Sequence, residues 1–270
     1  MLNNNEKFYY DIIVNSCPQA TNIRHPDIKG AVCPVFLADT REGTKVFRFN
    51  EASVAFRNRS IGNLLVDNGI LTPAITTHGY RSTWYEKYNY CPDKTLYEHL
   101  TAKEFDDKQI ESVYKQALTQ MAEMAKVKPI SFSHNNLMNY QEVFVASMKQ
   151  RLHPALVEFY GYFVRVLAGG DAPKLVHNDL NQKNILTTED GTLTRILDLD
   201  AVALANESFA VMMALRYYPL NNHHEMIEFY QDITGHKLNE KAIMLGIQFL
   251  NTIRSTRHRF DRLFLHSPQR

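Results

Sequence analysis

Short β-type runs alternate with turn signals over the first 90 or so residues. The runs 32–38 and 44–49 are rich in β-branched and aromatic residues, and the Asp and Gly between them favour a hairpin. Apolar residues at helical spacing then predict one amphipathic helix over about 53–67, and Asn68-Gly69 marks its end. Two more strand-type segments follow before residue 90. This part of the chain predicts a small sheet that carries a single helix.

The pattern changes to helical spacing after Pro92. Apolar residues recur on one helical face over 106–127, and the run 142–167 has the same pattern, with Pro154 as a kink or a break.

Strand-type segments return at 174–180, 184–188 and 194–199, and the tripeptide EDG predicts a hairpin turn between the last two. Three helical stretches follow from residue 207. The expected fold is therefore α+β, with a β-rich amino-terminal lobe over 1–90 and a larger, mainly helical lobe over 91–270.

Composition narrows the class of protein. The 270 residues are 44% hydrophobic and 22% charged, which is ordinary for a globular chain. Lys and Arg number 30 against 29 Asp and Glu, so no global field recruits nucleic acid or an anionic membrane. The basic run 254–262 is interpreted as the solvent-exposed face of an amphipathic helix. Nucleic acid and membrane are not expected as partners.

The cysteines and the amino terminus bear on the compartment. Cys17, Cys33 and Cys91 lack metal-ligand spacing and leave one thiol unpaired, which suits a reducing compartment. The start of the chain lacks the pattern of a signal peptide, and no run of about 18 uncharged apolar residues occurs. A cytoplasmic protein is expected, while its oligomeric state is left open.

The strongest chemical signal is the octapeptide HNDLNQKN at 177–184. It fits the pattern H-x-D-L-x-x-x-N of a phosphotransferase catalytic loop. A second acidic segment, LDLD at 197–200, ends the last predicted strand. The hairpin between the two segments is expected to fold Asp198 back beside Asn184.

These residue types match what phosphoryl transfer requires, which is mainly alignment and charge neutralisation. A carboxylate beside the acceptor hydroxyl orients it and takes its proton, and Asp179 is the candidate. Amide and carboxylate oxygens hold Mg²⁺ against phosphates, and Asn184 and Asp198 are the candidates. His177 is expected to hold the loop by hydrogen bonds. A buried polar turn that closes a hairpin is the alternative, but it does not account for this order and spacing.

HNDLNQKNIL followed by ILDLDAV resembles the aminoglycoside phosphotransferase and choline kinase superfamily. Its catalytic loop is commonly H-x-D-x-x-x-x-N, and its metal aspartate lies in an I-D-[FLW]-[DEG] string, where this chain has Leu197 in place of Ile. The resemblance implies a two-lobed, protein-kinase-like fold with ATP and Mg²⁺ in the cleft between the lobes. Asp179 is then the base, and Asn184 and Asp198 are the metal ligands.

The resemblance also implies a cation for the ATP phosphates on the third strand, where TKVFRF offers Arg48. A guanidinium holds phosphate bidentately, so Arg in place of Lys is compatible with catalysis. A helix Glu commonly pairs with this cation. Asn58 stands at its position in this chain, which leaves Glu51 as the nearest acidic substitute.

The strand that ends before the first long helix is expected to form the hinge. The resemblance implies that the backbone of Glu86, Lys87 and Tyr88 meets the adenine edge of the nucleotide. A glycine-rich phosphate loop is missing, since the segment HPDIKGAV has only Gly30. This absence argues against a protein kinase more than against phosphoryl transfer.

The charge balance bears on the acceptor. Residues 201–270 hold six acids against eight bases, which does not suit a polycationic aminoglycoside. A sugar or amino sugar fits best, with Asp200 and Arg216 either on the acceptor side or joined in a structural ion pair. A choline- or ethanolamine-type kinase and a catalytically silent kinase-like binding protein remain the alternatives.

Overall fold

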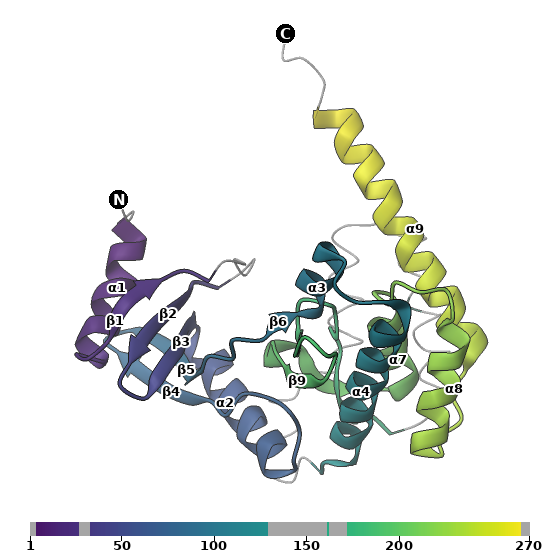
Figure 1. Cartoon of the computed structure of the whole chain (residues 1–270), viewed down its shortest axis with the longest axis horizontal. Helices are drawn as coiled ribbons and strands as arrows, with labels where there is room; N and C mark the ends of the chain where they lie inside the picture. The colour runs from purple at the N-terminus through teal and green to yellow at the C-terminus, as the bar shows by residue number, and fades with distance from the viewer. Residues whose placement is uncertain (1–3, 27–32, 129–160, 162–171, 266–270) are drawn as a thin grey trace. The chain divides into compact units, whose positions relative to one another are not determined.

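The computed structural model describes residues 4–26, 33–128, 161 and 172–265, with only the backbone described over 253–265, and it folds into two units (Figure 1). The first unit is Met1–Asp93 with Thr194–Asp200, and the second is Lys94–Leu193 with Ala201–Arg270. Much of the predicted run 142–167, most of the segment HPDIKGAV and the side chains of the basic run 254–262 lie outside the described residues.

The first unit contains an antiparallel five-stranded sheet in the order β1-β2-β3-β5-β4. Its strands are β1 Thr21–Arg24, β2 Val35–Thr40, β3 Gly43–Asn50, β4 Thr76–Tyr80 and β5 Thr83–Asn89. The predicted hairpin is the β2–β3 pair, and the two later strand segments pair as β4 and β5. This sheet and the helix-rich second unit confirm the predicted α+β class.

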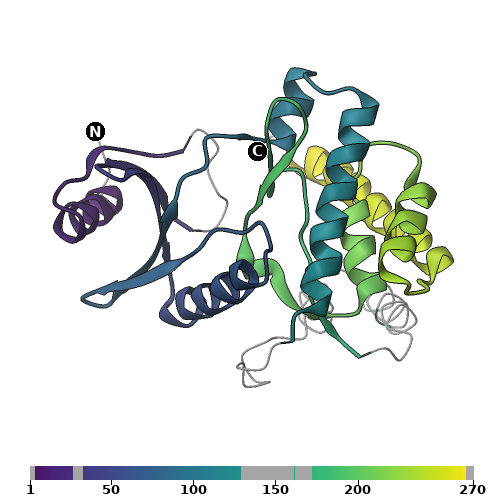
Figure 2. The ribbon, with the colours of Figure 1, turned by 60° about the horizontal axis from the view of Figure 1, so that its bottom comes forward.

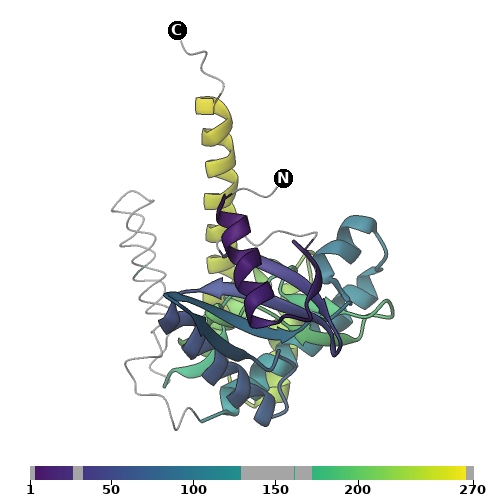
Figure 3. The ribbon, with the colours of Figure 1, turned by 90° about the vertical axis from the view of Figure 1, so that its left-hand side faces the viewer.

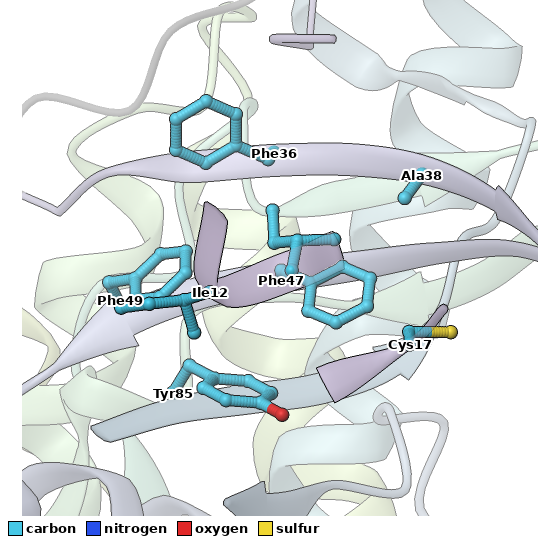
Figure 4. Packing of buried hydrophobic residues seen from close by; sticks show 8 residues of the cluster. Ile12, Cys17, Phe36, Ala38, Phe47, Phe49 and Tyr85 are labelled. Atoms are coloured by element: carbon cyan, nitrogen blue, oxygen red, sulfur yellow. The ribbon is translucent and has the colours of Figure 1, made fainter. Parts of the chain in front are cut away.

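Two helices pack on the sheet, where the sequence predicts one. The helix α2, Ala52–Asp67, was predicted, whereas α1, Asn4–Ser16, was not. A 13-residue helix is marginal in isolation, and α1 gains its stability from tertiary contacts. Its residues Ile12 and Ile13 are buried against the sheet, together with the nearby Cys17 (Figure 4).

Side-chain alternation along β3 and β5 separates the two faces of the sheet. Phe47, Phe49 and Tyr85 lie in the apolar cluster with α1. Burying an aromatic or aliphatic side chain contributes roughly 1.5–3 kcal/mol, so this face supplies much of the stability of the unit. The alternate residues, Arg48 and Glu86 among them, face the other way, towards α2. Figure 3 shows the two helices on opposite faces of the sheet.

The second unit is built mainly of helices, which Figures 1 and 2 show packed beside one another. They are α3 Leu96–Ala102, α4 Asp107–Lys126, α7 Glu207–Leu215, α8 His223–Thr234 and α9 Glu240–Leu265. Short strands accompany them: β6 Lys94–Thr95, β7 Lys174–His177, β8 Ile185–Thr187 and β10 Val202–Ala205, while β9 Leu193–Ile196 begins at the last residue before the segment Thr194–Asp200 of the first unit. β7 pairs with β10, and the other three strands form a sheet in the order β6-β8-β9.

Helix boundaries and burial follow from local sequence. Asp106 caps α4 in a capping box with Gln109, so both side chains satisfy backbone N–H groups of the first turn. The segment ESFAVMMAL is apolar around most of its circumference, and all nine residues of α7 are buried. The predicted EDG turn is present, and Gly191 adopts a φ of 85° there, which favours glycine.

In the part of the chain that the structure describes, no helix is both long enough and apolar enough to span a lipid bilayer. Cys17, Cys33 and Cys91 are all free thiols.

Candidate active site

The predicted catalytic loop follows β7 directly. Val176, His177 and Asn178 are buried, whereas the side chain of Asp179 is 27% exposed. Asn178 fixes the start of the loop, because its backbone N–H donates to the carbonyl of Ala201 at 3.0 Å and its side chain donates to the same oxygen at 3.2 Å. The loop therefore starts at buried residues and exposes the carboxylate of Asp179 to solvent.

Two side chains hold the Asp179 carboxylate. Asn181 Nδ2 donates to Oδ2 at 2.9 Å, and Arg216 Nη2 donates to Oδ1 at 3.2 Å. Hydrogen bonds that involve a charged donor or acceptor are stronger than neutral ones. Both carboxylate oxygens are therefore oriented, while the side chain keeps access to solvent.

Arg216 is the C-cap of α7 and is itself fixed in place. Its Cζ lies 4.4 Å from the centre of the Tyr217 ring, and its Nη2 donates to the Tyr217 hydroxyl at 2.5 Å. A guanidinium over an aromatic face is a favourable cation–π arrangement. The buried Nε has no hydrogen-bond partner, so the Arg216 side chain is held through its two terminal nitrogens.

The remaining polar residues of the loop close it. Asn184 Nδ2 donates to the backbone carbonyl of Asp179 at 2.8 Å, which turns Oδ1 away from that carbonyl. The backbone N–H of Asp179 donates to His177 Nδ1 at 3.2 Å, in agreement with the structural role expected for this histidine. Gln182 donates to the carbonyl of Tyr217 at 2.7 Å, and Lys183 lies over the exposed ring of Tyr97.

The first unit contains a second polar cluster, centred on Arg48. This side chain is 16% exposed, and its Nη2 donates to Asp200 Oδ2 at 2.5 Å and to Asp198 Oδ1 at 3.2 Å. Glu86, the cross-strand neighbour on β5, places Oε2 3.9 Å from Arg48 Nη1. One guanidinium thus faces three carboxylates.

The pKa values in this cluster reflect competition between burial and charge. Burial acts to lower the pKa of Arg48, but Asp200, Glu86 and Asp198 outweigh it and raise the pKa above its ordinary value. For Glu86 burial dominates and raises the pKa, although Arg48 and two amide donors act against it. Arg48 is therefore charged at any physiological pH.

Helix α2 contributes an amide to this cluster in place of an acid. Asn58 is fully buried, and its Nδ2 donates to Glu86 Oε1 at 2.8 Å and also to Asp200 Oδ1. Asn58 therefore does stand at the helix position next to Arg48. Glu51, the proposed acidic substitute, is the exposed N-cap of α2 without a side-chain capping bond, and the ion pairs of Arg48 among the described residues are with Glu86, Asp198 and Asp200.

Asp198 has a φ of 62°, in the left-handed region. Asp adopts this conformation more readily than most residues, but it still costs of order 1 kcal/mol or more. Strained residues of this kind cluster at functional sites. The side chain is 37% exposed, so its carboxylate is accessible to a ligand as well as paired with Arg48.

The residues predicted to hold Mg²⁺ suit that ion chemically. Asp198 offers a partly exposed carboxylate, and the amide oxygen of Asn184 points away from its own loop carbonyl. Three carboxylates against Arg48 also leave negative charge for a cation to neutralise. Among the described residues no group of three or more His, Cys, Asp and Glu forms a metal cluster, so a bound cation would also need oxygens from its ligand.

The strand pairing bears on the predicted hinge. Glu86 and Lys87 have partners on both β3 and β4, whereas Tyr88 is paired with β3 alone. The backbone of the first two residues is thus engaged in the sheet. Contact between the backbone of Glu86–Tyr88 and an adenine edge stays a prediction, with Tyr88 and the segment after β5 as its best candidates.

The structure brings some predicted residues together and separates others. Asp179 and Arg216 meet in the second unit, while Arg48, Asp198 and Asp200 meet in the first. Asp200 is paired with Arg48, and Arg216 with Asp179, while an Asp200–Arg216 ion pair stays a prediction because these two residues lie in different units. Proximity of Asn184 to Asp198 stays a prediction, since the two lie in different units.

Sequence reasoning missed three contributors to these clusters. Asn50 donates to Glu86 Oε1 at 2.7 Å, Tyr217 supports Arg216, and Arg57 donates to the backbone carbonyl of Asp200 at 3.2 Å. For Asn50 a signal existed, because it lies two residues after Arg48 and so on the same face of β3. No comparable sequence signal links Arg57 to Asp200.

No protein-family model and no curated protein sequence matches the chain. Solved structures do match it. A thermostable mutant of aminoglycoside phosphotransferase APH(4)-Ia, in its apo form, has a TM-score of 0.65 at 15% identity and covers 93% of each chain. Spectinomycin phosphotransferase APH(9)-Ia, in complex with ADP and spectinomycin, has a TM-score of 0.59 at 16% identity over 89% of this chain and 83% of its own.

A third similar structure is macrolide 2'-phosphotransferase MphH from Brachybacterium faecium, an apoenzyme, with a TM-score of 0.58 at 16% identity over 98% of this chain and 99% of its own. At such identities the likeness establishes the fold. The chain has the two-lobed, kinase-like α+β fold of these phosphotransferase structures.

Proposed function

We propose that the protein is an ATP-dependent phosphotransferase that moves the γ-phosphoryl group to a hydroxyl of a small metabolite. The observation that carries this proposal is the oriented Asp179 carboxylate, held by Asn181 and Arg216 while still open to solvent. A side chain with no chemical task has little need for two charge-assisted contacts and an exposed position. The fold shared with known phosphotransferases supports the same conclusion.

The residues divide the work of the reaction. Asp179 accepts a hydrogen bond from the acceptor hydroxyl, orients its oxygen towards the phosphorus and takes the proton as the O–P bond forms. Arg216 keeps the carboxylate in a fixed orientation. Arg48 binds phosphate oxygens of the nucleotide, for which a guanidinium is well suited. The contacts that orient Asp179 and Arg48 for these roles are present in the structure.

Asp198 and Asn184 are proposed to hold Mg²⁺, since both offer hard oxygen ligands. The ion supplies charge neutralisation for the phosphates. The nucleotide is proposed to lie on the first unit, with the adenine near Tyr88 and the segment after β5. The similar spectinomycin phosphotransferase was solved in complexes with ADP and with AMP, which supports the proposal that this protein binds a nucleotide.

A sugar or amino sugar is the proposed acceptor. Among the described residues, Asn181 and Arg216 donate to the Asp179 carboxylate and Tyr217 contacts Arg216, so these groups are neutral or basic. Several ammonium groups of an aminoglycoside need carboxylate partners, and no second carboxylate contacts Asp179 among the described residues. Hydroxyl-rich neutral acceptors match amide, guanidinium and phenol groups better. Arg216 and Tyr217 are the side chains proposed to face this acceptor.

An acceptor panel tests the proposal. Hexosamines, simple sugars, choline, ethanolamine and aminoglycosides are each incubated with ATP and Mg²⁺, and release of ADP is measured. We expect turnover with a sugar or amino sugar. Thermal shifts with ATP, with and without Mg²⁺, separate an enzyme from a silent binding protein, because a kinase is stabilised by ATP mainly when the metal is present. No nucleotide binding under either condition would refute the proposal.

A further inference from the structure

Arg48 shares one nitrogen between two carboxylates of the same short segment. Its Nη2 lies 2.5 Å from Asp200 Oδ2 and 3.2 Å from Asp198 Oδ1. The distance of 3.9 Å from Nη1 to Glu86 Oε2 is too long for a hydrogen bond. Of the three carboxylates, Asp200 therefore makes the shortest contact with the Arg48 guanidinium. Strand pairing in the sheet does not by itself fix the position of that guanidinium.

Asp200 is also held by helix α2. Asn58 of α2 donates to its Oδ1, and Arg57 of α2 donates to its backbone carbonyl at 3.2 Å. Helix α2 thus contacts Asp200 through two successive residues, one neutral and one basic. The first turn of this helix contains no acid. The acid that balances Arg48 is supplied by the segment after β9 instead.

The other two carboxylates are less suited to this task. Glu86 has its Oε1 occupied by Asn50 and Asn58, its Oε2 has no hydrogen-bond partner among the described residues, and burial raises its pKa. Asp198 is the proposed metal ligand, and a cation on its carboxylate repels Arg48. The contacts of Asp200 with Arg48 and α2 do not involve Asp198, the proposed metal ligand.

We propose that Asp200 is the positioning residue that holds Arg48 in place for the nucleotide phosphates, with Asn58 as the neutral adaptor that ties α2 to it. The proposal rests on the proposed function, because it names the counter-charge of the same nucleotide site. It follows that the acid paired with Arg48, Asp200, lies on the same short segment as the proposed metal ligand Asp198. Position 58 must then be an amide, since a carboxylate there would face both Glu86 and Asp200.

The first test compares Asp200→Asn with Asp200→Glu, using the affinity of the full chain for ADP, both in EDTA and with Mg²⁺. Asp39→Asn is the matched control, because Asp39 also pairs with an arginine of the same unit, Arg24, at 3.1 Å. We expect Asp200→Asn to weaken ADP binding about tenfold or more under both conditions, as loss of a charged hydrogen bond implies. Asp200→Glu retains part of the affinity, and Asp39→Asn matches the wild type.

Two outcomes overturn the proposal. If Asp200→Asn binds ADP as the wild type does in EDTA, Arg48 needs no help from Asp200. If affinity falls only with Mg²⁺, Asp200 is a metal ligand instead. Failure of the wild type to bind ADP at all refutes the proposed function. A double-mutant cycle of Arg48→Met and Asp200→Asn in urea unfolding then still tests the pairing, and additive effects would refute it.

Asn58→Asp gives an independent check of the adaptor role. The new carboxylate replaces an amide that lies 2.8 Å from Glu86 Oε1, so like charges meet in a buried site. We expect a lower melting temperature and weaker ADP binding. Tighter ADP binding would show that an acid on α2 positions Arg48 better than Asp200 does, and would overturn the assignment to Asp200.

Discussion

The guanidinium of Arg216 links the Asp179 carboxylate to an aromatic ring. Its Nη2 lies 3.2 Å from Asp179 Oδ1, and its Cζ lies 4.4 Å from the centre of the Tyr217 ring. The ring limits how the guanidinium can tilt, and the guanidinium in turn limits rotation of the carboxylate. The orientation of the proposed base thus depends on the residue that follows α7.

Arg216→Lys tests this dependence. Lysine keeps the positive charge but lacks the planar fork and stacks poorly on the ring, so Asp179 loses its fixed orientation. We expect kcat to fall by roughly 10²-fold, the cost of a small misplacement, while KM for ATP stays near the wild-type value. Lys126→Ala removes a surface ion pair with Glu123 and serves as the control. An unchanged kcat would show that positive charge alone suffices.

Asp179→Asn removes the proposed base without changing the size of the side chain. We expect kcat to fall about 10²–10⁴-fold, because general base catalysis typically contributes that much, with the affinity for ADP retained. Phosphoryl transfer is followed by ADP release, and affinity by calorimetry. Asp190→Asn alters an aspartate that accepts hydrogen bonds within the turn of the same unit, and should turn over normally. Normal turnover by Asp179→Asn would remove the base assignment.

Glu86→Gln predicts a pH dependence of stability. Burial raises the folded-state pKa of Glu86 above 4.5, so its protonated form is favoured in the folded protein. The stability that this group contributes is present below pH 4.5 and is lost as the pH rises through the raised folded pKa. Glu86→Gln does not undergo this loss of stability. Its unfolding free energy should therefore rise relative to that of the wild type as the pH rises from 4.5 through the raised folded pKa, and the difference should be constant at higher pH.

Urea unfolding at a series of pH values measures this difference. Glu111→Gln is a control of opposite sign, because hydrogen bonding and ion pairing with Lys115 lower the pKa of Glu111. Its stabilisation is present above pH 4.5 and is lost as the pH falls, so this variant should lose stability against the wild type as the pH rises. Parallel curves for the wild type and Glu86→Gln would contradict the prediction.

Gly62→Ala tests the packing of α2 against the Asp198 segment. A Cβ at position 62 would lie 3.0 Å from Leu199 Cδ1 and 3.1 Å from the carbonyl oxygen of Pro73. Alanine gains about 1 kcal/mol of helix propensity, but overpacking costs about 1–3 kcal/mol, and a backbone oxygen cannot move aside as a side chain does. We expect a lower melting temperature. Ser60→Ala, on the exposed side of the same helix, should be neutral or slightly stabilising.

The sequence determined the parts of this protein whose information is local. The proposed catalytic loop could be picked out because its residues lie within eight positions, and α4 because its apolar residues repeat at helical spacing. The β2–β3 hairpin and the EDG turn carry their own turn residues. The helix α1 was missed, because its stability depends on packing against a sheet that begins after it.

The tertiary structure alone decided which charges meet. Asp200 is 152 positions from Arg48, and Arg216 is 37 positions from Asp179, so no spacing rule links them. The acid that balances Arg48 could have come from α2, as the superfamily pattern suggests, or from another segment. Packing of α2 on the sheet brings the amide of Asn58 to this place, and the carboxylate of Asp200 supplies the negative charge. A buried cation requires a counter-charge, but this requirement does not specify which part of the chain supplies it.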